Sequence, residues 1–211
     1  MNQFVLISIF YLFLSPTSNA YVGGGEAICG SLQNPDGPFD YRRHDFTKGI
    51  PQGNNHFTPE IERLERGRTS YLLDDIDYTL RYWPNHHRAL WAISHYERQN
   101  NGNLPGTDRM RGGWQHSADG YFDRAMPDDG TVYMLYGMHL HLSGKPRQAL
   151  QHFQKAEQLG ENSAEFHYNY GLLLVDLEQY STALRHAQRA YSMDHPLSGL
   201  RNRLQNAGHW R

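Results

Sequence analysis

The sequence predicts an all-α protein built from stacked helical hairpins. From about Pro59 onward, apolar residues are spaced three and four apart, which is the spacing of a helix face. In the C-terminal half, small and aromatic residues also recur at one fixed offset along the chain. The matching pairs are Tyr136 with Tyr170, Gly137 with Gly171, Ala149 with Ala183, and Ala156 with Ala190. Such a repeat is typical of proteins in which each unit buries its apolar face against the next unit.

The first 20 residues are predicted to be a secretory signal peptide. Residues 4–14 form an apolar run without charge, and Ser18-Asn19-Ala20 has the small-x-small pattern of a cleavage site. No Lys or Arg precedes the run, so the terminal amine alone supplies positive charge. An uncleaved membrane anchor is the alternative, but the run is shorter than the about 20 residues that a spanning helix needs. We therefore expect an exported protein that is cleaved near Ala20.

The composition narrows the possible functions. The 211 residues are 38% hydrophobic, which suits one globular domain with a core. With 20 basic and 22 acidic residues the formal net charge is -2, so no basic surface is expected to neutralise nucleic-acid phosphates. Cys29 is the only cysteine, which excludes an internal disulfide. Its thiol is expected to be either buried and inert or paired with another molecule.

Residues 21–55 are predicted to form an irregular N-terminal arm. Turn-forming Gly and Pro residues divide this stretch and exclude long helices or strands. Phe39 and Tyr41 lie between the turns. These aromatic residues indicate that the arm packs onto the helical part of the chain.

The helices are expected in the following order. A first hairpin turns at Gly67 and ends at Pro84, a helix carries Leu90, Ile93 and Tyr96, a short helix covers 118–126, and two hairpins cover 131–158 and 164–193. Residues 100–114 are rich in Asn and Gly and are expected to form a loop, longer than the about 2–8 residues usual between helices. Asp128 or Asp129 is expected to cap the helix that follows. Pro196–Gln205 is expected to form a closing helix with Leu197, Leu200 and Leu204 pointing inward.

Residues 131–195 resemble the tetratricopeptide repeat family. In the last repeat, Tyr168-Asn169-Tyr170-Gly171 is similar to the opening motif of the family, and Tyr180, Ala183 and Ala190 match later positions. The preceding repeat matches in the same frame at Tyr133, Tyr136, Gly137, Gly144, Ala149, Phe153 and Ala156. The resemblance extends less clearly over 56–195, with 100–114 as an insertion and 196–211 as a capping helix and tail. It implies a right-handed α-solenoid whose first helices line a concave groove that binds proteins or peptides.

Two further runs of residues resemble one particular group of repeat proteins. PFDY at 38–41 and YTLRYWPNHHRAL at 78–90 are similar to small exported repeat proteins of Gram-negative bacteria. This resemblance implies a periplasmic location after export. The family holds terminal carboxylates with a clamp that needs lysines, and this chain lacks lysines at the matching positions. We therefore do not expect this chain to bind terminal carboxylates in that way.

The family frame also predicts which side chains the groove presents. The candidate binding residues are Arg88, Trp91, His95, Arg98, Met134, Met138, His141, Tyr168 and Leu172. The first four fall at steps of three and four, on one helix face. Arg and Trp are common anchors at interfaces, and Met adapts to varied partners. We therefore expect a groove for an extended peptide with an acidic or carboxylate end, while ordinary core packing of Trp91, Met134 and Met138 is the alternative.

A second, chemical hypothesis is a metal-dependent or enzymatic site on the His-rich face with the 100–114 loop. The chain has 13 histidines, but His139 and His141 are two positions apart and face different sides, and His87 and His95 are two turns apart. Asp74, Asp75 and Asp77 are expected on a solvated face, with Asp74 or Asp77 paired to Arg81. Ser94 beside His95 is adjacency in sequence and does not make a catalytic pair. No metal ligand set, cofactor site or catalytic residue is therefore predicted.

The sequence favours a non-catalytic protein that binds a protein or peptide as an adaptor or scaffold in envelope assembly, secretion or export. Nucleic acid is not expected as a partner, and membrane contact is expected only through an uncleaved signal segment. A third hypothesis is a structural subunit whose groove is filled by its own 21–55 arm.

Overall fold

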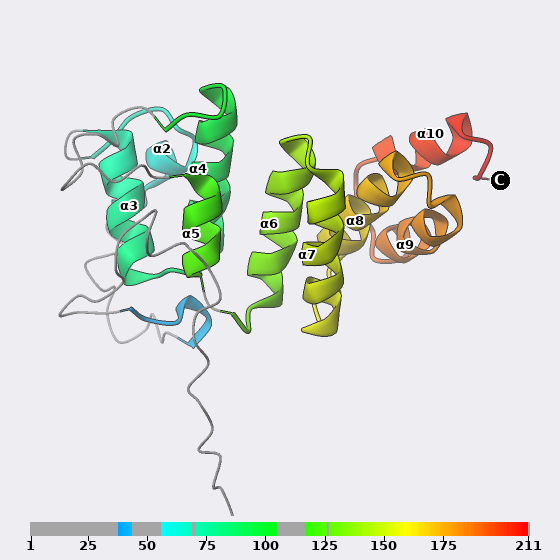
Figure 1. Ribbon diagram of the computed structural model, residues 1–211, viewed down its shortest axis with the longest axis horizontal. Coiled ribbons are helices and arrows are strands. Elements are labelled where there is room, and N and C mark those ends of the chain that lie inside the picture. The colour runs from blue at the N-terminus through cyan, green and yellow to red at the C-terminus, as the bar shows by residue number, and fades with distance from the viewer. Residues whose placement is uncertain (1–37, 44–55, 69–70, 105–116, 126, 211) are drawn as a thin grey trace, which may run out of the picture.

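The computed structural model describes residues 38–43, 56–68, 71–104, 117–125 and 127–210. Every regular element in these ranges is a helix; α2 to α5 lie together at one end of the molecule, and α6 to α10 follow one another along its long axis (Figure 1). They are η1 (Tyr41–Arg43), α2 (Pro59–Glu62), α3 (Leu72–Tyr82), α4 (His87–Gln99), α5 (Ala118–Arg124), α6 (Gly130–Leu142), α7 (Pro146–Gln158), α8 (Ala164–Asp176), α9 (Tyr180–Ser192) and α10 (Gly199–Asn206). The predicted all-α class is confirmed for this part of the chain. The predicted signal peptide, Cys29, and most of the predicted arm and of the 100–114 loop lie outside the described residues.

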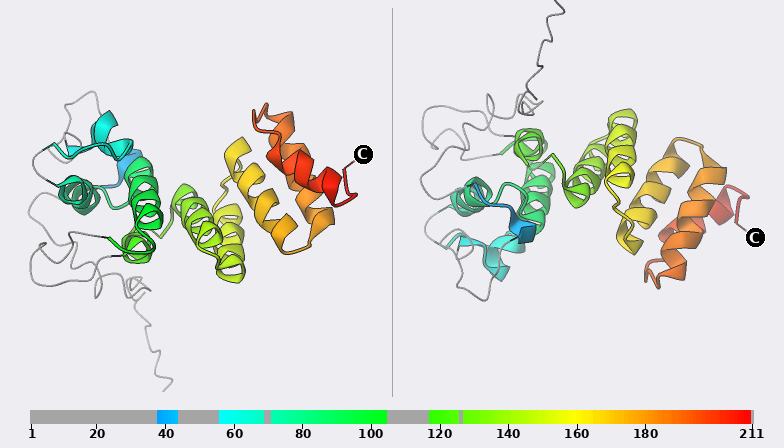
Figure 2. Two further views of the ribbon diagram at one scale, coloured as in Figure 1. Left: turned by 90° about the horizontal axis from the view of Figure 1, so that it is seen from above. Right: turned by 90° about the horizontal axis from the view of Figure 1, so that it is seen from below.

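Two hairpins in the C-terminal half repeat each other along the sequence. α6 and α8 begin at Gly130 and Ala164, and α7 and α9 begin at Pro146 and Tyr180. Both pairs of starting points are therefore separated by the same offset as the repeated residues. Because all four helices contain 13 residues, the last residues of α6 and α8, and those of α7 and α9, are separated by that offset too. Figures 1 and 2 show the hairpins as successive helix pairs, with α10 beyond them.

Close packing inside the first hairpin depends on a missing side chain. Ala149, Phe153 and Ala156 of α7 are fully buried. A Cβ atom added to Gly137 of α6 would lie 2.8 Å from the Phe153 ring, which is closer than such contacts occur. Gly137 therefore allows α7 to pack closely against α6.

The second hairpin uses its matching glycine differently. A Cβ atom added to Gly171 of α8 would lie 2.5 Å from the side chain of Leu200 in α10. Gly171 thus makes room for the closing helix α10. Leu200 and Leu204 are fully buried as predicted, whereas Leu197 is 58% exposed and does not point inward. The difference arises because α10 begins only at Gly199, so Leu197 precedes the helix.

The N-terminal helices depart from the hairpin predicted there. α2 contains four residues, and Leu64 soon after it has a left-handed backbone (φ 60°) that a right-handed helix cannot continue. α2, α3 and α4 pack together around the buried Ile61, Ile76 and Ile93. α4 also packs against α5 and α6 and so joins these helices to the first hairpin.

Side-chain polar contacts stabilise several helix starts. Asp129 caps α6 as predicted, because its Oδ1 accepts hydrogen bonds from the backbone N–H groups of Thr131 (3.1 Å) and Val132 (3.2 Å). Ser117 and Ser163 cap α5 and α8 in the same way. Of these caps, only the one on α6 was predicted from the sequence, at Asp128 or Asp129.

Two of the three α3 aspartates do not lie on a solvated face. Asp75 and Asp77 are buried, which corrects that prediction. Asp77 forms the predicted ion pair with Arg81 at 2.7 Å, but it also accepts a hydrogen bond from the Tyr121 hydroxyl at 2.8 Å. The Tyr121 hydroxyl of α5 thus contacts Asp77, and the Arg68 N–H donates to Asp75 at 2.7 Å, so other parts of the chain cover a helix face that looks exposed when α3 is considered alone.

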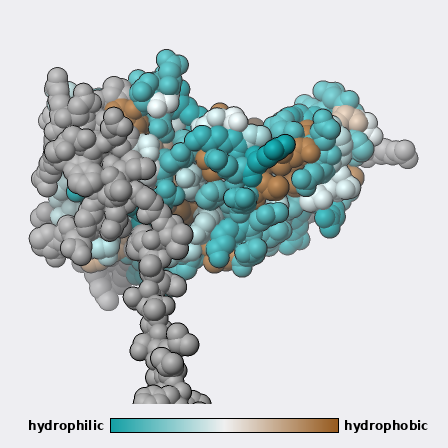
Figure 3. Space-filling model, in the orientation of Figure 1, coloured by the Kyte–Doolittle hydropathy of each residue, from teal (hydrophilic) through white to brown (hydrophobic). Residues whose placement is uncertain are grey.

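No helix among the described residues is long and apolar enough to cross a bilayer. Over these helices the face shown in Figure 3 is mainly hydrophilic, with hydrophobic residues in small separate groups.

Candidate functional site

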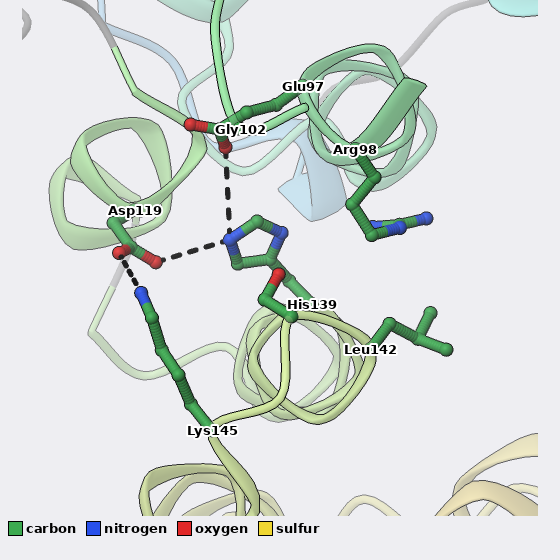
Figure 4. Close-up of a pocket in the computed structure, with 8 residues that line it drawn as sticks. Glu97, Arg98, Gly102, Asp119, His139, Leu142 and Lys145 are labelled. Atoms are coloured by element: carbon green, nitrogen blue, oxygen red, sulfur yellow. Dashed lines mark hydrogen bonds and ion pairs between the residues drawn. The ribbon is translucent and has the colours of Figure 1, made fainter. Parts of the chain in front are cut away.

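A pocket of about 420 Å³ lies where the end of α4 meets α5 and the α6–α7 turn. Its lining residues are Glu97, Arg98, Gly102, Asp119, His139, Leu142, Ser143 and Lys145 (Figure 4). The pocket therefore combines two carboxylates, two permanent cations, one imidazole and an apolar side chain.

His139 is the centre of the charged side of this pocket. Its Nε2 lies 3.3 Å from Asp119 Oδ1 and 3.9 Å from Glu97 Oε2. Lys145 Nζ donates to Asp119 Oδ2 at 3.0 Å. His139 and then Lys145 lower the pKa of Asp119 to about 2, although burial opposes them. Burial raises the pKa of Glu97.

The other nitrogen of His139 faces a buried serine. His139 Nδ1 lies 2.9 Å from Ser94 Oγ, and Arg98 donates a hydrogen bond to the same Oγ. Ser94 Oγ therefore contacts both Arg98 and His139. The resulting chain of contacts runs from Arg98 through Ser94 and His139 to Asp119 and Lys145.

Arg98 lies on the other side of the His139 ring from Asp119 and Lys145, together with Leu142 (Figure 4). Its guanidinium carbon is 5.0 Å from the centre of the Trp91 ring, a cation–π distance. Burial lowers the pKa of Arg98. Among the described residues, no carboxylate lies within ion-pair distance of this guanidinium.

The Ser94, His139 and Asp119 arrangement has the residue types of a hydrolase triad but lacks an accessible nucleophile. Ser94 is fully buried inside α4, and its Oγ is occupied by Arg98. A substrate carbonyl cannot approach an oxygen in that position. The contacts instead hold Arg98 in place.

Metal binding finds no support in the described part of the chain. No three His, Cys, Asp or Glu side chains there are arranged to hold an ion. His139 and His141 do face different sides, as predicted, because His141 Nε2 pairs with Asp176 of α8 at 2.6 Å. Arg203 of α10 pairs with the same Asp176.

The predicted groove residues separate into three groups. On α4, Arg88 and His95 are exposed, and Trp91 and Arg98 are half-buried along the same helix face. Arg88 is engaged by Glu62 of α2, and His95 Nε2 lies 3.2 Å from the Gln99 amide nitrogen.

The second group lies in the core. The side chains of Met134, Met138 and Tyr168 are buried, so they are not presented to a partner. The third group, His141 and Leu172, is half-buried on α6 and α8. Of the predicted set, Trp91 and Arg98 are in direct contact, because the Arg98 guanidinium lies over the Trp91 ring.

The described part of the arm packs at the opposite end of α4. Phe39 N–H donates to the Tyr82 carbonyl at 2.8 Å, and its ring lies 5.3 Å from that of Trp83. Tyr41 N–H donates to Asn85 Oδ1 at 2.8 Å. The runs 38–41 and 78–90, singled out in the sequence, therefore contact each other.

Ionic contacts extend this packing to α6. Asn85 Nδ2 donates to both Asp40 (2.7 Å) and Asp129 (2.9 Å), and His87 Nε2 lies 2.9 Å from Asp129 Oδ2. Arg42 lowers the pKa of Asp40 well below its usual range. Burial would raise the pKa of Asp129, but His87 and Asn85 outweigh it and the pKa is lowered. The prediction that the arm packs on the helical body is confirmed for residues 38–43.

Sequence reasoning missed Glu97, Asp119, Leu142, Ser143 and Lys145 as pocket residues. Asp119 and Lys145 belong to a short helix and a turn, and neither position carries a periodic signal. The one sequence signal for this pocket was His139, which lies on the core-facing side of a helix. A buried imidazole needs a polar partner, so polar side chains are expected beside it.

No family model matches this sequence, and comparisons with curated proteins and with solved structures found no match.

Proposed function

We propose that this protein is an exported, non-catalytic helical-repeat protein that binds a segment of a partner protein. In this proposal α6–α7 and α8–α9 are units of a right-handed, tetratricopeptide-like solenoid, and α10 is its cap. The partner segment lies along the polar face of α4 and continues toward α6 and α8. The cellular setting is the bacterial envelope, where the protein acts as an adaptor or scaffold.

The observation that carries this proposal is the duplication of the hairpin at one fixed offset along the chain. Proteins made of stacked hairpins present an extended surface that suits binding of other chains. The face of α4 adds anchors of the kind found at interfaces, since Trp91 and Arg98 are stacked and half-buried. The described part of the arm lies at the start of α4, whereas Arg98 lies in its last turn, so residues 38–43 leave this end of the face open.

In-cell photocrosslinking tests the proposal. A photoreactive residue replaces Trp91 or Leu172, and trapped proteins are identified by mass spectrometry. Gln151, exposed on α7, is the matched control position on the second helix of a hairpin. We expect one envelope protein to be trapped at both test positions and not at the control. Trapping only of this chain's own N-terminal segment, or of nothing, contradicts the proposal.

A further inference from the structure

We propose that the pocket beside Arg98 binds the side-chain carboxylate of an Asp or Glu in a partner segment, with an apolar residue of that segment against Leu142. This inference rests on the proposed function and gives the chemistry of the partner at one site.

Arg98 is held in place before any partner binds. Its guanidinium lies over the Trp91 ring and donates to Ser94 Oγ. Ser94 is in turn fixed by the buried His139 at 2.9 Å. A guanidinium in this setting loses little side-chain freedom on binding, which favours affinity.

The charge of Arg98 has no carboxylate partner within the described residues, although two carboxylates line the same pocket. Asp119 is held by Lys145 and His139 on the far side of the imidazole (Figure 4). Glu97 accepts a hydrogen bond from the backbone N–H of Ala118 at 3.0 Å. Both acidic groups are therefore engaged by other side chains or backbone groups, and no carboxylate of the described residues lies within ion-pair distance of the half-buried Arg98 guanidinium.

A carboxylate is the group that best complements this cation. Its two oxygens match the planar donor fork of an arginine, and such bonds are about twice as strong as neutral ones. Leu142 shares the pocket and is 58% exposed, one of the few large apolar side chains so exposed in the described ranges. An acidic residue next to an apolar one would satisfy both features.

A side-chain carboxylate fits this pocket better than a chain terminus. It reaches Arg98 on a flexible stem while the main chain stays outside.

The test is an NMR titration of the full chain with three acetylated peptides. The first is acetyl-Gly-Glu-Leu-Gly-amide, the second carries Gln in place of Glu, and the third is acetyl-Gly-Gln-Leu with a free carboxylate. We expect the Glu peptide to shift the Trp91 indole and Leu142 methyl signals in a saturable way, with at least about tenfold weaker binding of the Gln peptide. Raising the salt from about 50 to 500 mM should weaken the Glu peptide further.

Variants assign the effect to this pocket. Arg98→Gln should weaken the Glu peptide about tenfold, and Arg98→Lys should weaken it less, because charge remains without the planar fork. Leu142→Gln, at an exposed position, should weaken it about threefold through the lost apolar contact alone. Arg147→Gln, exposed on α7, is the control and should change nothing.

Three outcomes would overturn the inference. They are equal binding of the Glu and Gln peptides, tighter binding of the free-carboxylate peptide, and no saturable shift at Trp91 with the fold intact. Crosslinking from Trp91 in the Arg98→Gln protein separates this failure from that of the proposed function. If the yield of the trapped partner is unchanged in that variant, only the carboxylate site is refuted. If no partner is trapped by the protein of native sequence, the proposed function itself is refuted.

Discussion

Lowering the pH should destabilise the second hairpin through His186. The imidazole is 8% exposed, its Nδ1 lies 2.9 Å from Nδ1 of His167, and its ring lies 4.4 Å from that of Tyr170. Burial lowers the pKa of His186 from 6.5 to about 4. Between these values the unfolded chain binds a proton that the folded chain does not, so stability falls as the pH decreases from 6.5 to 4. The loss is about 2 kcal/mol at pH 5 and about 3 kcal/mol once the pH is below 4.

Urea unfolding followed by circular dichroism measures this loss at pH 7.5 and pH 5. His186→Phe keeps an aromatic ring that cannot be protonated. Between pH 7.5 and pH 5, the free energy of unfolding of this variant should therefore fall by about 2 kcal/mol less than that of the native sequence. His95→Phe, at an exposed position of α4, is the control and should retain the native pH dependence. If His186→Phe and the native sequence lose the same free energy between the two pH values, the reasoning is refuted.

Three further substitutions test the packing, each by urea unfolding at neutral pH. Phe153→Ala should cost about 3–5 kcal/mol because it leaves a cavity between α6 and α7, whereas the exposed Lys155→Ala should stay within about 0.5 kcal/mol. Asp129→Ala should cost about 3 kcal/mol, since it removes the α6 cap and the acceptor of buried hydrogen bonds, while Asp128→Ala should cost under about 1 kcal/mol. Gly137→Ala should cost about 1–3 kcal/mol because its methyl group would overlap the Phe153 ring. A small effect of Gly137→Ala would mean that the ring can move aside.

The duplicated hairpins were predictable because their signals are local. Gly137 and Phe153 are close in sequence and meet within one hairpin, so their spacing indicates their contact. One duplicated feature was nevertheless missed. His152 packs 4.1 Å from Tyr136, as His186 packs 4.4 Å from Tyr170, and burial lowers the pKa of both imidazoles. The two histidines are separated by the same offset as the other repeated residues, so this signal was visible in the sequence.

The α3 aspartates and the groove methionines show where local patterns fail. Asp77 looks solvated on an isolated helix, but α5 supplies the Tyr121 hydroxyl that makes its burial tolerable. Met134 and Met138 occupy positions that line a groove in the family frame, yet both are buried. Helix faces are classified by periodicity, whereas exposure depends on which neighbouring helices cover them.

The helical class, the length of the repeating unit, a cap at Asp128 or Asp129 and the polar face of α4 could all be predicted from the sequence. These features follow from spacing and from caps that act within a few residues. Only the tertiary structure decided that Ser94 meets His139, 45 positions away, and that α5 brings Asp119 to the same imidazole. The packing of three helices creates that contact chain and leaves Arg98 without a carboxylate partner in the described ranges. No spacing along one helix encodes such a meeting, because it depends on how separate helices pack against one another.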